Sequence, residues 1–252
     1  MKKPINFLSN KSLLEQIWLS KLSYCDVIDH DAAVVVDVIT DDLTTVDEPD
    51  QTIRLVTDIH IPDGAYTENG HLKDGLRFEP FILYRSEIVD GALRLREVAR
   101  SHSRNGEFET DHGNLTPTLS RQMELLVTRY ALKPSWRGYT YRDEMESYAR
   151  TVLVKSGLKF NEARTQNPFA YFTQLVTNAF IRVNNEEARE RSLRDDLLEA
   201  AGAPPSMTRQ LANLPSISEG GEVRHILKAD PERLAKVQAY RESLRRSRKG
   251  KS

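Results

Sequence analysis

Hydrophobic and polar positions follow two different periods along this chain, and the change of period divides it into regions. Apolar residues recur every three or four positions in several stretches between residues 115 and 192, which is the spacing of one helix face. Between about residues 30 and 100 they come instead in β-branched runs and in strict alternation, which predicts strands. The pattern therefore predicts an α+β protein in which strands and helices occupy separate parts of the chain.

A short helix is predicted ahead of the strands, from Asn10 to Leu22. Ser12-x-x-Glu15 has the form of a capping box, in which the two side chains satisfy free amide groups at a helix start. The apolar face of this helix is formed by Leu13, Leu14, Ile17 and Trp18. A single apolar face predicts that the helix packs against another part of the chain.

The β-rich region contains three predicted strands, at residues 32–39, 53–61 and 78–85. The first is a β-branched run, the second alternates apolar and polar residues, and the third combines aromatic and branched side chains. Turns are predicted at Pro62-Asp63-Gly64, Asp74-Gly75 and Asp90-Gly91. Residues 101–114 are polar and are expected to form a linker.

Residues 115–192 are predicted to form three helices. They begin at Thr116-Pro117, at Thr140-x-x-Asp143 and at Asn167-Pro168, and Gly157 is expected to end the second. Their apolar faces are formed by Leu119, Met123, Leu126 and Tyr130; by Met145, Tyr148, Ala149, Val152 and Leu153; and by Phe172, Leu175, Val176, Ala179, Phe180 and Val183.

The remaining part of the chain is expected to be less regular. Residues 192–223 are rich in proline and glycine, and a last helix is predicted from Asp230-Pro231 to about Arg246, followed by a basic tail. The predicted organisation is an N-terminal helix at 1–24, an acidic β-rich insert and linker at 25–112, a helical domain at 113–195, and a flexible linker with a basic C-terminal helix at 196–252.

Charge is distributed unevenly, although the net charge of the chain is only −1. From Asp26 to Asp63 there are eleven acidic residues and one basic residue, Arg54, whereas Arg224 to Lys251 holds ten basic residues and three acidic ones. This asymmetry is typical of a protein with one end that faces nucleic acid and one that repels it. Two solvated faces of opposite sign are the alternative interpretation.

Several classes of protein are disfavoured by the sequence. Cys25 is the single cysteine, no Cys/His set has zinc-site spacing, and His30, His60 and the acidic block fit no metal motif. The N-terminal residues do not form an apolar signal region, and no stretch approaches the roughly 20 apolar residues of a membrane span. No phosphate loop, nucleophile elbow or acid–base pair is evident. We expect a cytoplasmic protein that is not an enzyme and uses no cofactor or metal.

The third helix of the helical region carries a narrow polar stripe opposite its apolar face. Aromatic, amide and guanidinium groups have the chemistry to stack on bases, to bond base edges and to meet phosphates. An ordinary solvated helix face is the alternative. The stripe is formed by Tyr171, Gln174, Asn178, Arg182, Asn185 and Arg189.

The same helix resembles a known family. Lys159-Phe160-Asn161, the run from Asn167 to Gln174 (Asn-Pro-Phe-Ala-Tyr-Phe-Thr-Gln), and Asn178 to Arg182 are similar to region 2 of sigma-70 family factors. With the run from Trp136 to Met145, they look most like the late-transcription sigma factors of T-even-type bacteriophages, whose opening helix also resembles Asn10 to Glu15. The likeness covers roughly residues 7–22 and 115–192.

The resemblance implies a function in transcription initiation. It assigns Tyr171, Asn178 and Arg182 to the −10 promoter element or its flanking phosphates. Gln174 and Leu175 stand where host-type factors have a tryptophan pair that wedges the duplex open, so readout of an A·T-rich, easily melted site is expected instead. It also implies docking on the β′ coiled coil of the bacterial RNA polymerase core, for which the candidates are Asp143, Glu144, Glu146 and Arg150.

This chain departs from the phage family in its β-rich insert and in its basic C-terminal run, where that family has a clamp-binding peptide. From the resemblance, the expected partners are promoter DNA, the polymerase core and other phage transcription factors, in the cytoplasm of an infected bacterial cell. Two alternatives stay open: a polymerase-binding inhibitor or appropriator that does not read a promoter, and an unrelated DNA-binding regulator.

Overall fold

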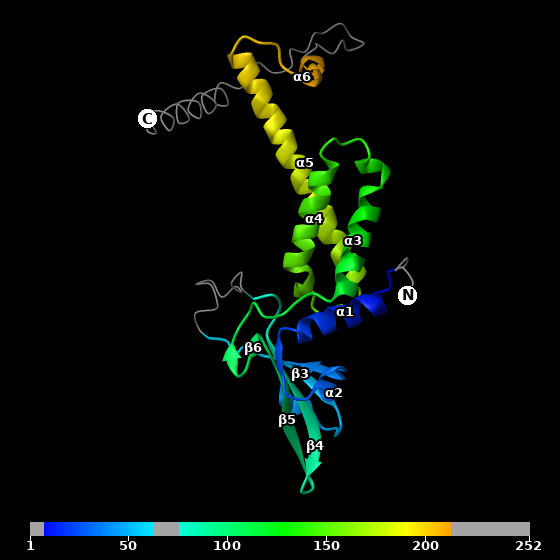
Figure 1. Cartoon of the computed structure of the whole chain (residues 1–252), viewed down its shortest axis with the longest axis vertical. Coiled ribbons are helices and arrows are strands. Elements are labelled where there is room, and N and C mark those ends of the chain that lie inside the picture. The colour runs from blue at the N-terminus through cyan, green and yellow to red at the C-terminus, as the bar shows by residue number, and fades with distance from the viewer. Residues whose placement is uncertain (1–7, 63–75, 213–252) are drawn as a thin grey trace, which may run out of the picture. The chain divides into compact units, whose positions relative to one another are not determined.

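The computed structural model describes residues 8–62 and 76–212 of the chain (Figure 1). Helices and a sheet are both present, so the predicted α+β class is confirmed. The chain forms two compact units, Met1–Ile181 and Arg182–Ser252, and the boundary between them falls inside one long helix. The sheet and most of the helices therefore belong to the first unit.

The helix predicted at Asn10–Leu22 is present with those bounds and is α1. Its N-cap is Ser9, whose hydroxyl oxygen accepts a hydrogen bond from the Ser12 amide at 3.2 Å. The predicted capping box of Ser12 and Glu15 is therefore wrong, because the helix begins one turn earlier. The Ser12 hydroxyl instead accepts a hydrogen bond from the Gln122 side chain at 2.8 Å, which joins α1 to a later helix.

Five strands of the described part form one sheet in the order β1-β5-β4-β3-β2. The strands β2 and β3 run parallel, and the other neighbouring pairs run antiparallel. The strands are β1 (Cys25–Val27), β2 (Val38–Thr40), β3 (Thr52–Val56), β4 (Phe81–Val89) and β5 (Ala92–Ser101). A short 3-10 helix, η1 (Leu43–Thr45), lies between β2 and β3.

The β-branched run at residues 32–39 is a strand only at its end. A short helix, α2 (His30–Ala33), begins where the Asp29 carboxylate accepts a hydrogen bond from the Ala32 amide at 3.1 Å. Val34 and Val35 then leave 52% and 61% of their surface exposed. The local cap outweighs the strand propensity of the run, because that propensity depends on neighbours against which the side chains can pack.

The other predicted strands are shifted or shorter than expected. The strand at 53–61 ends at Val56, and the strand at 78–85 lies at Phe81–Val89. The predicted turn at Asp90-Gly91 joins β4 to β5, and both residues are left-handed, with φ of 54° and 78°. A two-residue hairpin of type I′ requires this conformation at both positions. The other two predicted turns include residues outside the described ranges.

The expected linker at residues 101–114 is structured for much of its length. It begins with the last residue of β5 and contains a two-stranded hairpin of β6 (Ser103–Arg104) and β7 (Glu107–Phe108). His102 lies between β5 and β6 with φ of 50°, and its side chain is fully buried against Phe78. The polar composition of this stretch therefore did not indicate a linker.

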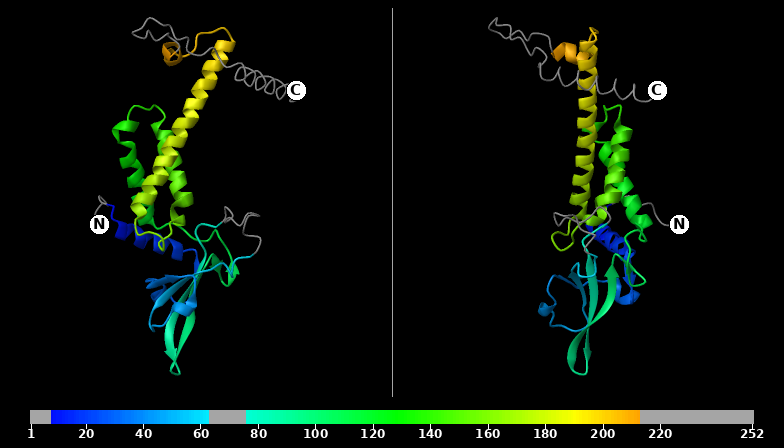
Figure 2. Two further views of the ribbon diagram at one scale, coloured as in Figure 1. Left: turned by 180° about the vertical axis from the view of Figure 1, so that it is seen from behind. Right: turned by 90° about the vertical axis from the view of Figure 1, so that its left-hand side faces the viewer.

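The helical region agrees closely with the prediction. Its helices are α3 (Pro117–Ala131), η3 (Pro134–Trp136), α4 (Arg142–Ser156), η4 (Gly157–Lys159) and α5 (Pro168–Ala200). Thr116 caps α3 and α4 ends before Gly157, as expected, but Thr140 does not cap α4, which has no side-chain cap. In Figures 1 and 2, α1 lies between the sheet and the pair α3–α4.

The second compact unit contains the end of α5 and a short helix, α6 (Met207–Ala212). The loose order expected from residue 192 is wrong for the first part of that stretch, because α5 continues to Ala200. Asp195 accepts hydrogen bonds from the Ser206 amide and hydroxyl, and Arg209 forms an ion pair with Asp196 at 2.6 Å. The helix predicted at 230–246 lies outside the described residues. No helix of the described part is both long and apolar enough to cross a membrane.

Candidate nucleic-acid and polymerase interfaces

The six residues of the predicted polar stripe lie on α5, three in each compact unit. In the first unit, Tyr171 is half-buried and its hydroxyl donates a hydrogen bond to the carbonyl oxygen of Ser156, the last residue of α4, at 2.8 Å. Its ring centroid lies 5.4 Å from that of Phe160. Burial raises the pKa of the Tyr171 hydroxyl above its ordinary value. Tyr171 is therefore partly a packing residue, and only part of its ring is available to a ligand.

Gln174 and Asn178, the other two stripe residues in this unit, are exposed. The side-chain Nε2 of Gln174 donates a hydrogen bond to the side-chain Oδ1 of Asn178 at 2.8 Å. This bond orients both amides and leaves the Gln174 oxygen and the Asn178 nitrogen for another partner. An acceptor and a donor side by side are the groups that a base edge requires.

In the second unit the stripe continues with Arg182, Asn185 and Arg189, all of them exposed. Arg182 forms an ion pair with Glu186, one helical turn further on, at 3.0 Å. The two side chains are 63% and 52% exposed, and a pair so open to water contributes little free energy. The guanidinium group of Arg182 therefore lies at the surface, in contact with solvent.

The four residues predicted to bind polymerase divide into two pairs. Asp143 and Glu144 are exposed in the first turn of α4, where negative charge is favourable at a helix N-terminus. Glu146 and Arg150 form a hydrogen bond at 2.9 Å, and Arg150 also bonds Glu124 of α3 at 2.7 Å. These bonds lower the pKa of Glu124 and raise that of Arg150. Arg150 therefore links α4 to Glu124 of α3, and Glu146 holds Arg150 within α4. Asp143 and Glu144 are the more available pair.

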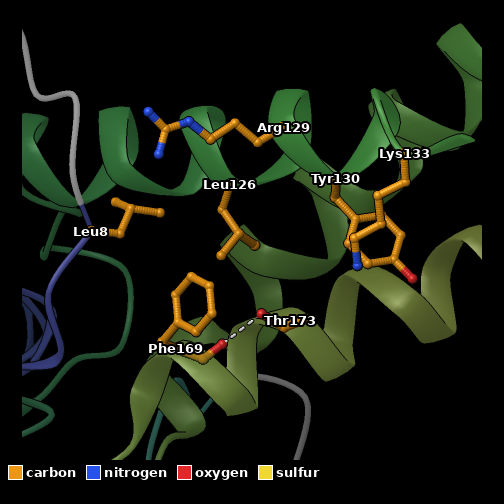
Figure 3. A pocket seen from close by; sticks show the side chains of 7 residues that line it. All are labelled: Leu8, Leu126, Arg129, Tyr130, Lys133, Phe169 and Thr173. Carbon is orange, nitrogen blue, oxygen red and sulfur yellow. Dashed lines mark hydrogen bonds between the residues drawn. The ribbon is translucent and has the colours of Figure 1, made fainter.

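An apolar pocket of about 300 Å³ lies between α3 and α5 (Figure 3). Its wall includes two aromatic rings, and Arg129 and Lys133 lie along its α3 side. The Lys133 ammonium group lies 4.0 Å from the centroid of the Tyr130 ring. The lining residues are Leu8, Leu126, Arg129, Tyr130, Lys133, Phe169 and Thr173.

A buried ionic cluster, absent from the sequence predictions, joins the sheet to the chain just before α5. Glu162 accepts hydrogen bonds from Lys21 of α1 at 2.7 Å and from Arg54 of β3 at 3.0 Å. The side chains of Lys21 and Arg54 are 1% and 4% exposed. Burial lowers the pKa of Lys21 to about 8, despite Glu162. For Glu162 burial raises the pKa, but the two cations outweigh it and the net shift is downward.

One signal in the sequence could have indicated this cluster. Arg54 is the single basic residue of the acidic stretch, and it stands between Ile53 and Leu55 in a strand whose other residues are mostly buried. A buried arginine requires a carboxylate nearby. The sequence does not show that Glu162, more than a hundred residues later, is that carboxylate.

The sheet also buries histidine. Burial lowers the pKa of His102 to about 3, and both nitrogens of its ring lack a hydrogen-bond partner among the described residues. His60 bonds the Ser101 carbonyl oxygen at 2.9 Å, and burial lowers its pKa as well. Within residues 8–62 and 76–212, no group of three or more potential ligands is arranged to hold a metal ion.

Comparison with models of protein families, with curated proteins and with solved structures finds no match. The likeness to sigma factors therefore rests on the residue pattern of the chain. A function is further assigned from the geometry of three features: the α5 stripe, the start of α4 and the pocket.

Proposed function

We propose that this chain is a promoter-recognition subunit of the sigma type, used late in bacteriophage infection. It binds the bacterial RNA polymerase core in the cytoplasm of the infected cell and directs it to A·T-rich promoters of the −10 type. One observation carries the proposal. The long helix α5 presents exposed amide and guanidinium side chains at Gln174, Asn178, Arg182, Asn185 and Arg189, in the stretch that resembles sigma region 2.

The chemistry of these side chains fits the expected ligand. Asparagine and glutamine amides pair with the edge of adenine, and arginine is the usual partner of phosphate. The positions of the family's tryptophan wedge hold Gln174 and Leu175. In the proposal α5 therefore selects promoters that melt readily, instead of forcing strands apart with aromatic rings.

The pocket between α3 and α5 adds support. Its apolar wall with the rings of Tyr130 and Phe169 would hold a base that has left the stack, and Arg129 and Lys133 would meet the neighbouring phosphates. A promoter strand that has begun to separate supplies such a base.

Polymerase binding is assigned to the start of α4. Asp143 and Glu144 are exposed there, and neither forms an ion pair with another described residue. Both carboxylates can meet a basic surface of the core enzyme without breaking an internal bond. Arg150, which is held by Glu146, would link α4 to Glu124 of α3.

A second function, a polymerase-binding inhibitor or appropriator without promoter readout, is favoured by one observation. The Tyr171 hydroxyl is bonded to Ser156, so the aromatic group of the stripe is partly withdrawn from DNA. The acidic start of α4 would serve an inhibitor equally well.

Co-purification with core polymerase, followed by run-off transcription from an A·T-rich promoter template, distinguishes these functions. A sigma subunit binds the core and yields a transcript of defined start. An inhibitor binds the core and yields none. A regulator unrelated to polymerase fails both assays, and that result would reject the proposal.

A further inference from the structure

The turn between α3 and α4 combines positive charge with aromatic rings. Residues 129–141 hold three basic residues, Arg129, Lys133 and Arg137, and no acidic residue. The same stretch holds four aromatic residues, Tyr130, Trp136, Tyr139 and Tyr141. The surface formed by Arg137, Trp136, Tyr139 and Tyr141, called the turn surface below, lies on other elements than the α5 stripe.

The rings of the turn surface form a chain that leads out of the helical core. Trp136 is fixed at the inner end, with its ring centroid 5.4 Å from that of buried Phe180. Tyr139 follows at 5.7 Å from Trp136, and Tyr141 at 5.2 Å from Tyr139. All three rings of the turn surface are half-buried, so each is held by packing and still meets solvent. Rigid rings of this kind bind a ligand without losing much conformational entropy.

Positive charge lies beside the rings in a form that a ligand can reach. The Arg137 side chain is exposed, and its Nε donates a hydrogen bond to the Leu132 carbonyl oxygen at 3.0 Å. Its two terminal nitrogens bond no other described residue, so the guanidinium group is oriented but available. The backbone beside it is also open, because a Cβ placed on Gly138 would meet nothing within 4 Å.

We propose that the turn surface binds single-stranded nucleic acid. Unpaired bases would stack on the rings of Tyr139 and Tyr141, and the phosphates between them would meet Arg137. Bases in a duplex stack on one another and do not offer their faces, so the rings select single strands. A single strand offers base faces for the rings and phosphates for the cation in alternation, which is the combination that this surface presents. The exposed acids Asp143 and Glu144 bound the surface on its α4 side and limit it to a short stretch of strand.

This inference goes beyond the proposed function, because it concerns a surface outside the α5 stripe and the pocket, and its test needs neither polymerase nor a promoter. The full chain is titrated against a fluorescently labelled oligothymidine and against a duplex of equal length, and anisotropy is measured. The test variant is Arg137→Gln with Tyr139→Leu, neither of which lines the pocket. The control is Lys155→Gln, an exposed residue of α4 with the same loss of charge.

The expected result is binding of the single strand about tenfold tighter than binding of the duplex. The double variant should weaken it about tenfold, as expected for a lost stack and a lost phosphate contact, and the control should change it less than about twofold. Loss of one phosphate contact should also lower the salt slope of the affinity by roughly 0.7. Arg137→Lys with Tyr139→Phe, which keeps the charge and the ring, should retain most of the affinity.

Four outcomes would overturn the inference: no binding of the single strand, a loss of duplex binding in the double variant as large as its loss of single-strand binding, an unchanged single-strand affinity in the double variant, or displacement of the strand by poly-glutamate at an equal charge concentration. If the double variant loses its helical circular dichroism, Arg137→Gln alone replaces it, because that side chain is exposed. A second signal is available in the emission of Trp136, which bound bases should quench in a Trp18→Phe background.

Discussion

The helical part and the sheet of the first compact unit are stabilised in different ways. Side chains at the centre of the helical part are apolar, and Leu119, Met145 and Phe172 are less than 2% exposed. The sheet buries Phe81 and Ile53 in the same way but also buries Thr52, Arg54, Ser86 and Ser101, and the buried polar residues His102 and Ser103 follow directly after it. The spacing of apolar residues in the sequence therefore identifies nearly all buried residues of a helical core. In a core that also buries charged and polar side chains, the same spacing identifies only the apolar ones.

The buried ion pairs also connect the sheet to the helices. Glu162 stands just before α5 and holds Lys21 and Arg54, which lie on α1 and β3. Trp18 of α1 packs on Phe81 of the sheet, with ring centroids 5.5 Å apart. The β-rich region resembles an insert in sequence, but its removal would uncover Trp18 of α1 and take Arg54 away from Glu162.

The largest effect is expected from Glu162→Gln. The substitution leaves Lys21 and Arg54 buried without a negative partner, and breaking a buried ion pair from one side costs roughly 3 to 5 kcal/mol. Urea unfolding should show this loss, and Glu144→Gln, an exposed carboxylate, should change stability by less than about 0.5 kcal/mol. A stability loss below about 1 kcal/mol for Glu162→Gln would contradict the assigned role of the cluster.

A comparable effect in the helical part is expected from an apolar residue. Phe172 is fully buried, whereas Phe169, one turn earlier on the same helix, is 43% exposed. Phe172→Ala should destabilise by about 3 kcal/mol or more, and Phe169→Ala by about 1 kcal/mol or less. Thermal unfolding of the two variants measures the difference. Similar losses would mean that α5 does not pack as described.

The contrast also explains how much could be predicted from the sequence. The apolar faces of the three long helices and the starts of α3 and α5 were predicted, because Thr116-Pro117 and Asn167-Pro168 act locally, whereas Thr140 does not cap α4. The run at 32–39 was predicted wrongly, because its conformation depends on a cap at Asp29 and on contacts with distant strands. The buried positions of His102 and Glu162 could not be predicted at all, since their partners lie far away in sequence.

For the candidate site, too, only the features that depend on local sequence were predicted. The stripe was predicted as one helix face, and in the structure its six residues lie on α5, three in each compact unit, with all but Tyr171 exposed. The bond from Tyr171 to Ser156 and the cross-link of Arg150 to Glu124 depend on other helices and were not foreseen. The aromatic chain of the turn surface lacks a regular period, and so a helical or strand pattern does not reveal it.

Acid should destabilise the first compact unit in part through His102, which is buried beside the sheet. Burial lowers the pKa of His102 from its ordinary 6.5 to about 3, so between these values the unfolded state binds more protons than the folded state. The free energy of unfolding should therefore fall as the pH drops from 6.5 towards 3. Urea midpoints at pH 7 and pH 4.5 measure this, and His102→Asn should reduce the difference. An identical difference in that variant would exclude His102 as the cause.

The smallest expected effect is at the start of α1. Ser9→Ala removes the side chain that caps the helix and should cost about 1 kcal/mol. Glu15→Ala should cost much less, because no capping box forms there. Denaturant midpoints of the two variants decide between the cap that the structure shows and the one that the sequence suggested.

We propose that α5 reads promoter DNA while the start of α4 binds the core enzyme. The most direct measurement is run-off transcription per core-bound molecule, compared between two double variants, Asn178→Ala with Arg182→Ala, and Asp143→Lys with Glu144→Lys. The first should bind core normally and lose about tenfold or more of its transcript, as expected for a lost base contact and a lost phosphate contact. The second should lose core binding, with any bound fraction still initiating correctly. Equal loss of core binding in both variants, or full transcription by the first, would contradict the account.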